Sequence, residues 1–191
     1  MNVKNVGGDE VGTFVRKYPN GQLRCISNYR NAIQEGLQEG WHENGKLQYR
    51  VNYIAGWKKN GLQEYWFENG QWRLKLNYKD DKEEGLQEEW WENGKQQYRK
   101  NYKDGTEEGL QEYWYENGQI KHIENYKSGR KDGVQEYYNT EGSLTEEYYL
   151  NSNKMTREQF KSHLVQLGKV VAHAMNLDEQ ALGLIIARLS I

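Results

Sequence analysis

The chain has 191 residues, of which 28 are acidic and 26 are basic, so its formal net charge at pH 7 is only -2. That balance argues against a protein that holds phosphate backbones through a general excess of positive charge. Aromatic residues make up 13% of the sequence, with seven Trp and fifteen Tyr, which excludes a disordered chain and predicts a largely aromatic buried surface.

The sequence also bears on the cellular compartment, because it lacks targeting and membrane-spanning segments. Its first residues show no apolar stretch of the signal-peptide kind, and no segment is apolar enough to cross a membrane. A single cysteine, Cys25, cannot form an intrachain disulfide and is typical of a reducing compartment. The chain also has no polybasic cluster. We therefore expect a cytoplasmic protein that does not bind membranes.

After a lead-in over residues 1–11, the sequence repeats one motif, as in the stretch GLQEYWFENGQ that begins at Gly61. Related stretches begin at Gly36, Gly85, Gly109 and Gly133. The period is 24 residues, except that one extra residue precedes Gly61. A fixed short period is typical of an elongated array in which each unit contacts mainly its neighbours. We expect residues 12–150 to form one such array.

Each unit is predicted to be a β-hairpin. Asn-Gly between aromatic runs, as at Asn69 and Gly70, is the strongest short-range hairpin signal, because both positions of a two-residue turn need positive φ. We favour that turn because it places opposite charges face to face. The pairs are Glu39–Arg50, Glu64–Lys75 and Glu88–Arg99. A three-residue loop with a glycine bulge, which shifts the pairing by one residue, is the alternative.

The favoured register also sorts the side chains of a unit. It pairs Trp66 with Arg73 and Phe67 with Trp72. One face would carry Tyr65, Phe67, Trp72, Leu74 and Leu76, and the other Leu62, Glu64, Trp66, Arg73 and Lys75. An isolated hairpin is only marginally stable in water, so the units must join edge to edge. The predicted fold is therefore mostly β: a single elongated array of stacked antiparallel hairpins.

The stretch GLQEYWYENGQIKHIENYKSGRKDG, from Gly109 to Gly133, is similar to a known repeat. It resembles the MORN repeat variant of the bacterial YwqK-like antitoxin family, and the resemblance covers about residues 12–150. This resemblance implies an elongated, twisted sheet of hairpins without a catalytic motif. It also implies an antitoxin role.

Residues 151–191 have a different pattern, without Trp or Tyr and with a helical period. Thr156 and Gln159 fit a capping box at the start of a helix. Its apolar stripe comprises Phe160, Leu164, Leu167 and Val171, and a short second helix would carry Leu182, Ile185, Ile186 and Leu189. These helices either close the C-terminal end of the array or form a docking and self-association surface, and the two roles are compatible.

The repeat offers little to catalysis. Glutamates recur in columns such as Glu64, Glu88 and Glu112, whereas a catalytic carboxylate needs an environment unlike that of its neighbours. The four histidines show no metal-site spacing, and no glycine-rich phosphate loop is present. We predict no enzyme activity, no cofactor and no metal.

Protein binding is the function that remains. The repeat displays Trp, Tyr and Arg at regular intervals, and these residue types dominate protein interfaces. The chosen contact residues are of three kinds: residues that break the repeat, aromatic residues beside Arg or Lys together with Arg73, and members of a Glu column. They are Trp57, Lys58, Trp66, Trp72, Arg73, Trp91, Trp114, Glu64, Glu88 and Glu112. We expect an antitoxin, an immunity protein or a mobile-element inhibitor that blocks a partner such as a nuclease with a basic cleft. The alternatives are a module that binds RNA or single-stranded DNA, and an assembly scaffold that acts through the C-terminal helices.

Overall fold

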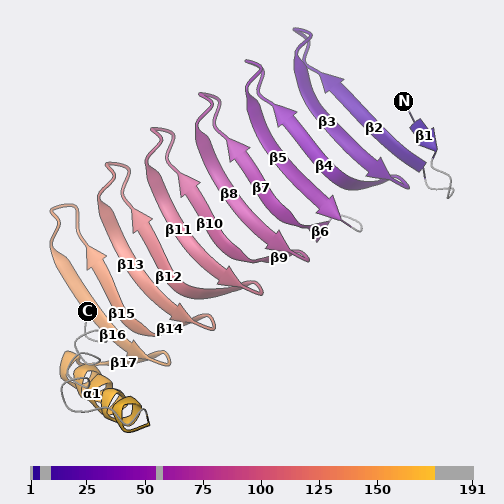
Figure 1. The fold of residues 1–191 in the computed structure, drawn as a ribbon. Coiled ribbons are helices and arrows are strands. Elements are labelled where there is room, and N and C mark those ends of the chain that lie inside the picture. Colours follow the sequence, from indigo (N-terminus) through magenta and orange to yellow (C-terminus); the bar gives the residue numbers. More distant parts are fainter. Residues whose placement is uncertain (1, 5–9, 55–57, 175–191) are drawn as a thin grey trace.

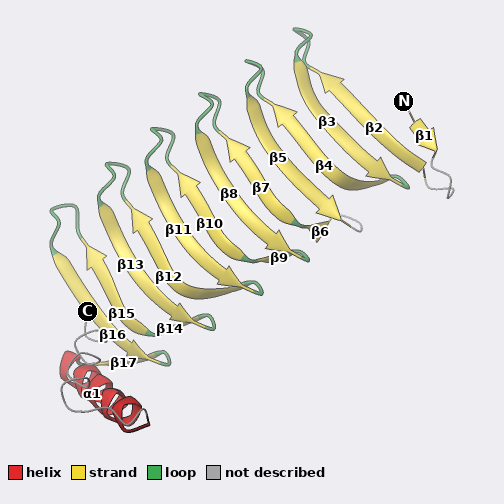
Figure 2. Ribbon diagram, in the orientation of Figure 1, coloured by secondary structure: helices red, strands yellow, loops and turns green. Residues whose placement is uncertain are grey.

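The computed structural model describes residues 2–4, 10–54 and 58–174. Figure 1 shows one long antiparallel sheet whose strands run across its short dimension, with a single helix at its C-terminal end. Seventeen strands join this sheet within the described residues (Figure 2). The predicted mostly β array of hairpins is therefore confirmed.

The strands follow one another along the chain, and each long strand pairs with the next. The elements are β1 (Asn2–Lys4), β2 (Glu10–Lys17), β3 (Leu23–Arg30), β4 (Ile33–Trp41), β5 (Leu47–Ile54), β6 (Lys58–Lys59), β7 (Gly61–Trp66), β8 (Trp72–Lys79), β9 (Lys82–Glu83), β10 (Gly85–Trp90), β11 (Gln96–Lys103), β12 (Thr106–Trp114), β13 (Ile120–Lys127), β14 (Arg130–Lys131), β15 (Gly133–Tyr138), β16 (Leu144–Leu150), β17 (Asn153–Met155) and α1 (Arg157–Ala174).

The Asn-Gly turns differ from the favoured prediction. In the third unit the Phe67 N–H donates to the Gln71 carbonyl at 2.9 Å, so the loop holds three residues, and Gly70 has a φ of 92°. This is the glycine-bulge alternative. It places Trp66 opposite Trp72 rather than Arg73, which corrects that predicted pair and also the pairing of Phe67 with Trp72.

A second irregularity restores the register further from the turn. The strands shift between Tyr65 and Trp66, so that Glu64 lies opposite Lys75 as predicted. The same pattern places Glu39 opposite Arg50 and Glu88 opposite Arg99. The charge pairs are therefore confirmed, although the turn that was expected to produce them is not the one that forms.

Two-residue turns do occur, but along the other long edge of the sheet. At Asp80 and Asp81, φ is 50° and 67°, and Lys79 pairs directly with Lys82. Both central residues thus have the positive φ of the tight hairpin turn that had been assigned to Asn-Gly. Figure 1 shows the longer Asn-Gly loops along one edge and these shorter turns along the opposite edge.

Asparagine recurs at the Asn-Gly loops because it links neighbouring units. The Asn69 side chain accepts from the Gln71 N–H at 2.8 Å within its own loop. Its Nδ2 donates to the Glu92 carbonyl of the next unit at 2.9 Å. The same bond across units forms from Asn20, Asn44 and Asn93.

Substitution of Asn93 tests this link. Asn93→Ala removes two hydrogen bonds, and we expect the free energy of unfolding to fall by about 1–2 kcal/mol. Asn117 is the matched control, because its Nδ2 donates to Gln119 within its own loop at 2.7 Å instead of to the next unit. Urea unfolding followed by Trp fluorescence should show a smaller loss for Asn117→Ala. Equal losses would contradict a stabilising role for the bond between units.

Glutamines, rather than aromatic side chains, fill the most enclosed positions of the described sheet. Five are at most 2% exposed: Gln38, Gln63, Gln87, Gln111 and Gln135. Most of the described Trp and Tyr side chains are intermediate in exposure, so aromatic rings cover much of the sheet without occupying its most enclosed positions. Among the described apolar residues, those classed as buried are Val51, Tyr148 and Phe160.

The side-chain amide of each buried glutamine forms the hydrogen bonds that a backbone peptide group would form in a regular strand pair. The pairing of β11 with β12 shifts between Lys100 and Tyr102, and Asn101 thereby loses its partner in the ladder. Gln111 Oε1 accepts from the Asn101 N–H at 2.9 Å, and Gln111 Nε2 donates to the Asn101 carbonyl at 2.9 Å. Both backbone groups are satisfied although they are buried, as buried polar groups must be.

The helix packs against β16, the last long strand of the described sheet. The capping box is confirmed, because the Thr156 N–H donates to Gln159 Oε1 and the Gln159 N–H donates to Thr156 Oγ1. Phe160 is buried, with its ring centroid 5.5 Å from that of Tyr148 on β16. The side chain of Val171 and the predicted second helix lie outside the described residues. In the part of the chain that is described, no helix is long and apolar enough to span a membrane.

Candidate functional site

The strand register assigns the side chains to two faces of the sheet. Residues directly opposite each other across paired strands, and residues two apart on one strand, share a face. One face carries a tryptophan row along the Asn-Gly edge, and we call it the tryptophan face. Its row contains Trp41, Trp66, Trp72, Trp90 and Trp114. The other, called the tyrosine face, carries among others Tyr49, Tyr65, Tyr98, Tyr113 and Tyr137.

A ladder of alternating charges runs along the middle of the tryptophan face. Consecutive strands place its members opposite one another in the order Glu39, Arg50, Glu64, Lys75, Glu88, Arg99 and Glu112. Arg50 lies 3.0 Å from Glu39 and 3.6 Å from Glu64. Arg99 lies 3.4 Å from Glu88 and 3.9 Å from Glu112. The predicted contact residues Glu64, Glu88 and Glu112 are thus neutralised by their neighbours.

The alternation ends near the C-terminal end of the ladder. Ile123 lies opposite Glu112, at the place where the pattern would continue with a basic residue. Glu136 and Glu146 then lie opposite each other on β15 and β16. Tyr138 donates its hydroxyl to Glu136 at 2.6 Å, and Arg157 of α1 lies 4.0 Å from Glu146. This end of the tryptophan face therefore has more negative charge than the rest.

Tryptophans gather where the third and fourth units meet. The ring centroids of Trp66 and Trp72 are 4.5 Å apart, and those of Trp72 and Trp90 are 6.4 Å apart. Lys75 Nζ lies 3.7 Å from the Trp72 ring centroid, a cation–π contact. Trp72 had been predicted on the face of Tyr65 and Leu74, but the loop bulge moves it to the side of Trp66. The side chains of the resulting cluster are partly exposed.

The other predicted contact residues are dispersed. Arg73 is the extra residue at the bulge, and its charge acts on Tyr65 and Glu89 of the tyrosine face. Trp91 lies at an Asn-Gly loop with its indole N–H buried and without an acceptor in the described structure. Lys58 is exposed on β6 at the opposite edge, and Trp57 lies outside the described residues. Trp66, Trp72, Trp114, Glu64, Glu88 and Glu112 share the tryptophan face.

The tyrosine face holds a polar network that the repeat pattern did not single out. Lys131 Nζ donates to Glu124 Oε1 at 2.9 Å and to the Tyr137 hydroxyl at 2.7 Å. Burial tends to raise the pKa of Glu124, but the hydrogen bond and the charge of Lys131 outweigh it, so this pKa lies below its ordinary value. These residues break the repeat, since the equivalent places of the third unit hold Leu76 and Glu83, which cannot form such an ion pair.

His122 on this face gives a prediction about pH. Burial is the main reason that its pKa lies below the ordinary 6.5; three nearby lysines act in the same direction, and Glu124 acts in the opposite direction. The unfolded chain therefore binds a proton at a higher pH than the folded one, and stability that is present above pH 6.5 is lost as the pH falls. The loss should be no more than about 1 kcal/mol, because the ring is only partly buried and solvent screens its charge.

Thermal unfolding at a series of pH values measures this loss. His122→Phe should keep the ring contact with Tyr113, whose centroid lies 3.9 Å away, and should remove the part of the stability loss that begins near pH 6.5, leaving the loss from carboxylates such as Glu124 at lower pH. An unchanged pH profile would contradict a neutral His122. Within the described residues, no group of His, Cys, Asp and Glu is arranged to hold a metal ion.

Comparison with known proteins supports the repeat assignment. The MORN repeat variant matches the chain in five segments, at residues 10–31, 34–55, 59–80, 83–104 and 107–128. No curated protein matches it. Among solved structures, the chain is similar to one in the "Crystal structure of GtfA/B complex bound to UDP and GlcNAc", with 16% identity and a TM-score of 0.25. That match covers 75% of this chain and 26% of the other, and it carries no argument about function.

Proposed function

The chain belongs to the MORN repeat variant family, whose members are in general non-catalytic binding scaffolds, and we propose that it binds a partner protein through its tryptophan face. The observation that carries this proposal is the cluster of Trp66, Trp72 and Trp90, with the Lys75 ammonium against the rings of Trp72 and Trp90. These tryptophans are only partly covered, and Trp is one of the residue types enriched among those that supply most of the binding energy in protein interfaces.

The charges of this face favour a protein over a nucleic acid as its ligand. Along the ladder every basic group lies beside a glutamate, so the face offers no continuous positive track for a phosphate backbone. A protein partner needs only local complementarity, which an apolar cluster flanked by alternating charges supplies.

We further propose that the partner presents basic groups and that binding blocks it, as expected of an antitoxin or immunity protein. Support comes from the C-terminal end of the ladder, where Ile123 interrupts the alternation and Glu136 and Glu146 follow. A partner whose basic cleft lies over these carboxylates while an apolar patch covers the tryptophans would match both features. A nuclease with a positively charged substrate cleft is such a partner.

Affinity capture from the natural host tests this function. The tagged full chain should retain one stoichiometric protein after treatment with added nuclease, and that protein's activity should fall when the chain is added back. Capture that disappears on nuclease treatment would instead point to nucleic acid. A retained protein whose activity does not change would contradict the blocking role but not the binding role.

A further inference from the structure

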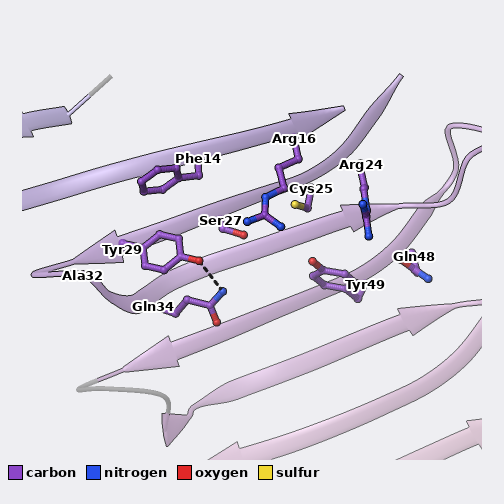
Figure 3. A pocket seen from close by; sticks show the side chains of 10 residues that line it. All are labelled: Phe14, Arg16, Arg24, Cys25, Ser27, Tyr29, Ala32, Gln34, Gln48 and Tyr49. Carbon is purple, nitrogen blue, oxygen red and sulfur yellow. Dashed lines mark hydrogen bonds between the residues drawn. The ribbon is translucent and has the colours of Figure 1, made fainter. Parts of the chain in front are cut away.

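A separate hollow lies on the tyrosine face, over the first two units (Figure 3). Its volume is about 570 Å³, within the range of small-molecule sites. Strands β2 to β5 supply its lining, with Ala32 at the turn between β3 and β4. The lining residues are Phe14, Arg16, Arg24, Cys25, Ser27, Tyr29, Ala32, Gln34, Gln48 and Tyr49.

The hollow exists because two neighbouring positions carry unusually small side chains. The register places Gly40 between Cys25 and Tyr49 across adjacent strands. At the position of Gly40, the later units have Tyr, Glu, Tyr and Tyr. Cys25 and Tyr49 occupy the same position in the first and second units, and the next three units have Leu, Tyr and His there. A Cβ on Gly40 would lie 2.1 Å from the Tyr49 ring, so this ring leans over the glycine. The space is thus specific to these units.

The charge of the lining is unlike that of the rest of the chain. Among the described residues, the lining contains two arginines and no carboxylate, although acidic residues outnumber basic ones in the whole sequence. Neither Arg16 nor Arg24 forms an ion pair with a described residue, whereas Arg50 and Arg99 on the opposite face each contact two glutamates. Guanidinium groups in such a position are well suited to bind phosphate or carboxylate.

Aromatic and amide groups complete the lining. Phe14 is 56% exposed, and its ring meets the Tyr29 ring edge to face at a centroid distance of 5.2 Å. Figure 3 shows the Arg16 side chain beside Cys25 and Ser27, with the Tyr49 ring across the hollow. Gln34 donates to the Tyr29 hydroxyl at 3.3 Å, which fixes that wall. A flat ring could stack against these aromatic walls while its anionic group meets the arginines.

We propose that this hollow binds a small aromatic anion, namely a planar ring compound that carries a phosphate or a carboxylate. The site is independent of the tryptophan face, which lies on the other side of the sheet. Cys25 provides a direct reporter of occupancy, because it lines the hollow and is the only cysteine in the sequence.

The test measures the rate at which iodoacetamide alkylates Cys25 in the full chain. Naphthyl phosphate and naphthoate serve as anionic probes, naphthol as the neutral analogue and inorganic phosphate as the anion alone. We expect at least one anionic probe to slow alkylation, with naphthol and phosphate much less effective. The two anionic probes distinguish a phosphate site from a carboxylate site. Isothermal titration calorimetry with the same probes gives the affinity independently of the thiol.

Variants then assign the interaction to the arginines. Arg16→Gln and Arg24→Gln should each weaken binding of the effective probe by about tenfold, the loss expected for one charge-assisted hydrogen bond. Arg73→Gln is the matched control: Arg73 follows its Asn-Gly pair at the same distance as Arg24 does, but it does not line the hollow. This variant should bind the probe as the wild type does.

Three outcomes would overturn the proposal. Alkylation that neither anionic probe slows at millimolar concentration would show that the hollow does not bind this class. Protection by naphthol equal to that by the anions would show an apolar site without a role for the arginines. Unchanged affinity in the folded Arg16→Gln and Arg24→Gln variants, with folding checked by thermal unfolding, would do the same.

Discussion

A Gln111→Met variant is expected to be less stable than the wild type by about 4 kcal/mol, since two buried backbone groups each lose a partner at about 1–3 kcal/mol. Methionine nearly preserves the length and volume of the side chain but cannot pair with the N–H and carbonyl of Asn101. Gln111 is fully buried, so water cannot replace the lost hydrogen bonds without opening the sheet. Urea unfolding followed by Trp fluorescence measures the loss.

Gln97→Met is the matched control for this substitution. Gln97 lies on β11 of the same hairpin array, is half-buried, and its side chain makes no hydrogen bond with a described residue. Its replacement should change the free energy of unfolding by less than about 0.5 kcal/mol. If both variants lost the same stability, the effect would come from methionine in a strand, and the glutamine ladder would not be the reason that GLQE recurs.

The second large effect concerns partner binding. Trp72→Leu is expected to weaken the complex with the captured partner by about 30-fold or more, the loss typical of a residue at the centre of an interface. Leucine occupies the equivalent place in other units, at Leu23, Leu47 and Leu144, so the fold should tolerate it. The contacts with Trp66 and Lys75 would be reduced without a new polar group. Titration of the purified partner gives the affinity.

Arg73→Ala supplies the control for Trp72→Leu. Arg73 is the neighbouring residue, but its charge acts on the tyrosine face, and its substitution should leave the affinity within about twofold of the wild type. A larger loss for Arg73→Ala than for Trp72→Leu would place the contact on the tyrosine face. Circular dichroism of both variants shows whether the sheet is intact.

The sequence predicted the architecture well, because the period and the Asn-Gly signal are local. It failed at the loop, where Asn-Gly is compatible both with a two-residue turn and with a three-residue loop closed by a glycine bulge. The charge pair of Glu64 and Lys75 could not decide between them, because a second irregularity next to Trp66 compensates for the longer loop. The predicted pairing in the middle of the strands was therefore correct, although the predicted turn was wrong.

The buried glutamines and the hollow were harder to predict from the sequence. Glutamine is usually exposed, and only the bulge at Asn101 shows why Gln111 must be buried. A signal for the hollow was present, because Cys25 and Gly40 both break the repeat with small residues. What the sequence could not show is that the two positions are adjacent across strands and that no carboxylate of a described residue lines the hollow beside Arg16.

Hydroxyl-radical footprinting of the chain, alone and in complex with its captured partner, tests the central claim most directly. Oxidation of Trp66, Trp72 and Trp90 should fall strongly in the complex, while Tyr98 and Tyr113 on the other face should react as they do in the free chain. Protection of those tyrosines with unchanged oxidation of the tryptophans would contradict the assignment of the tryptophan face as the binding surface.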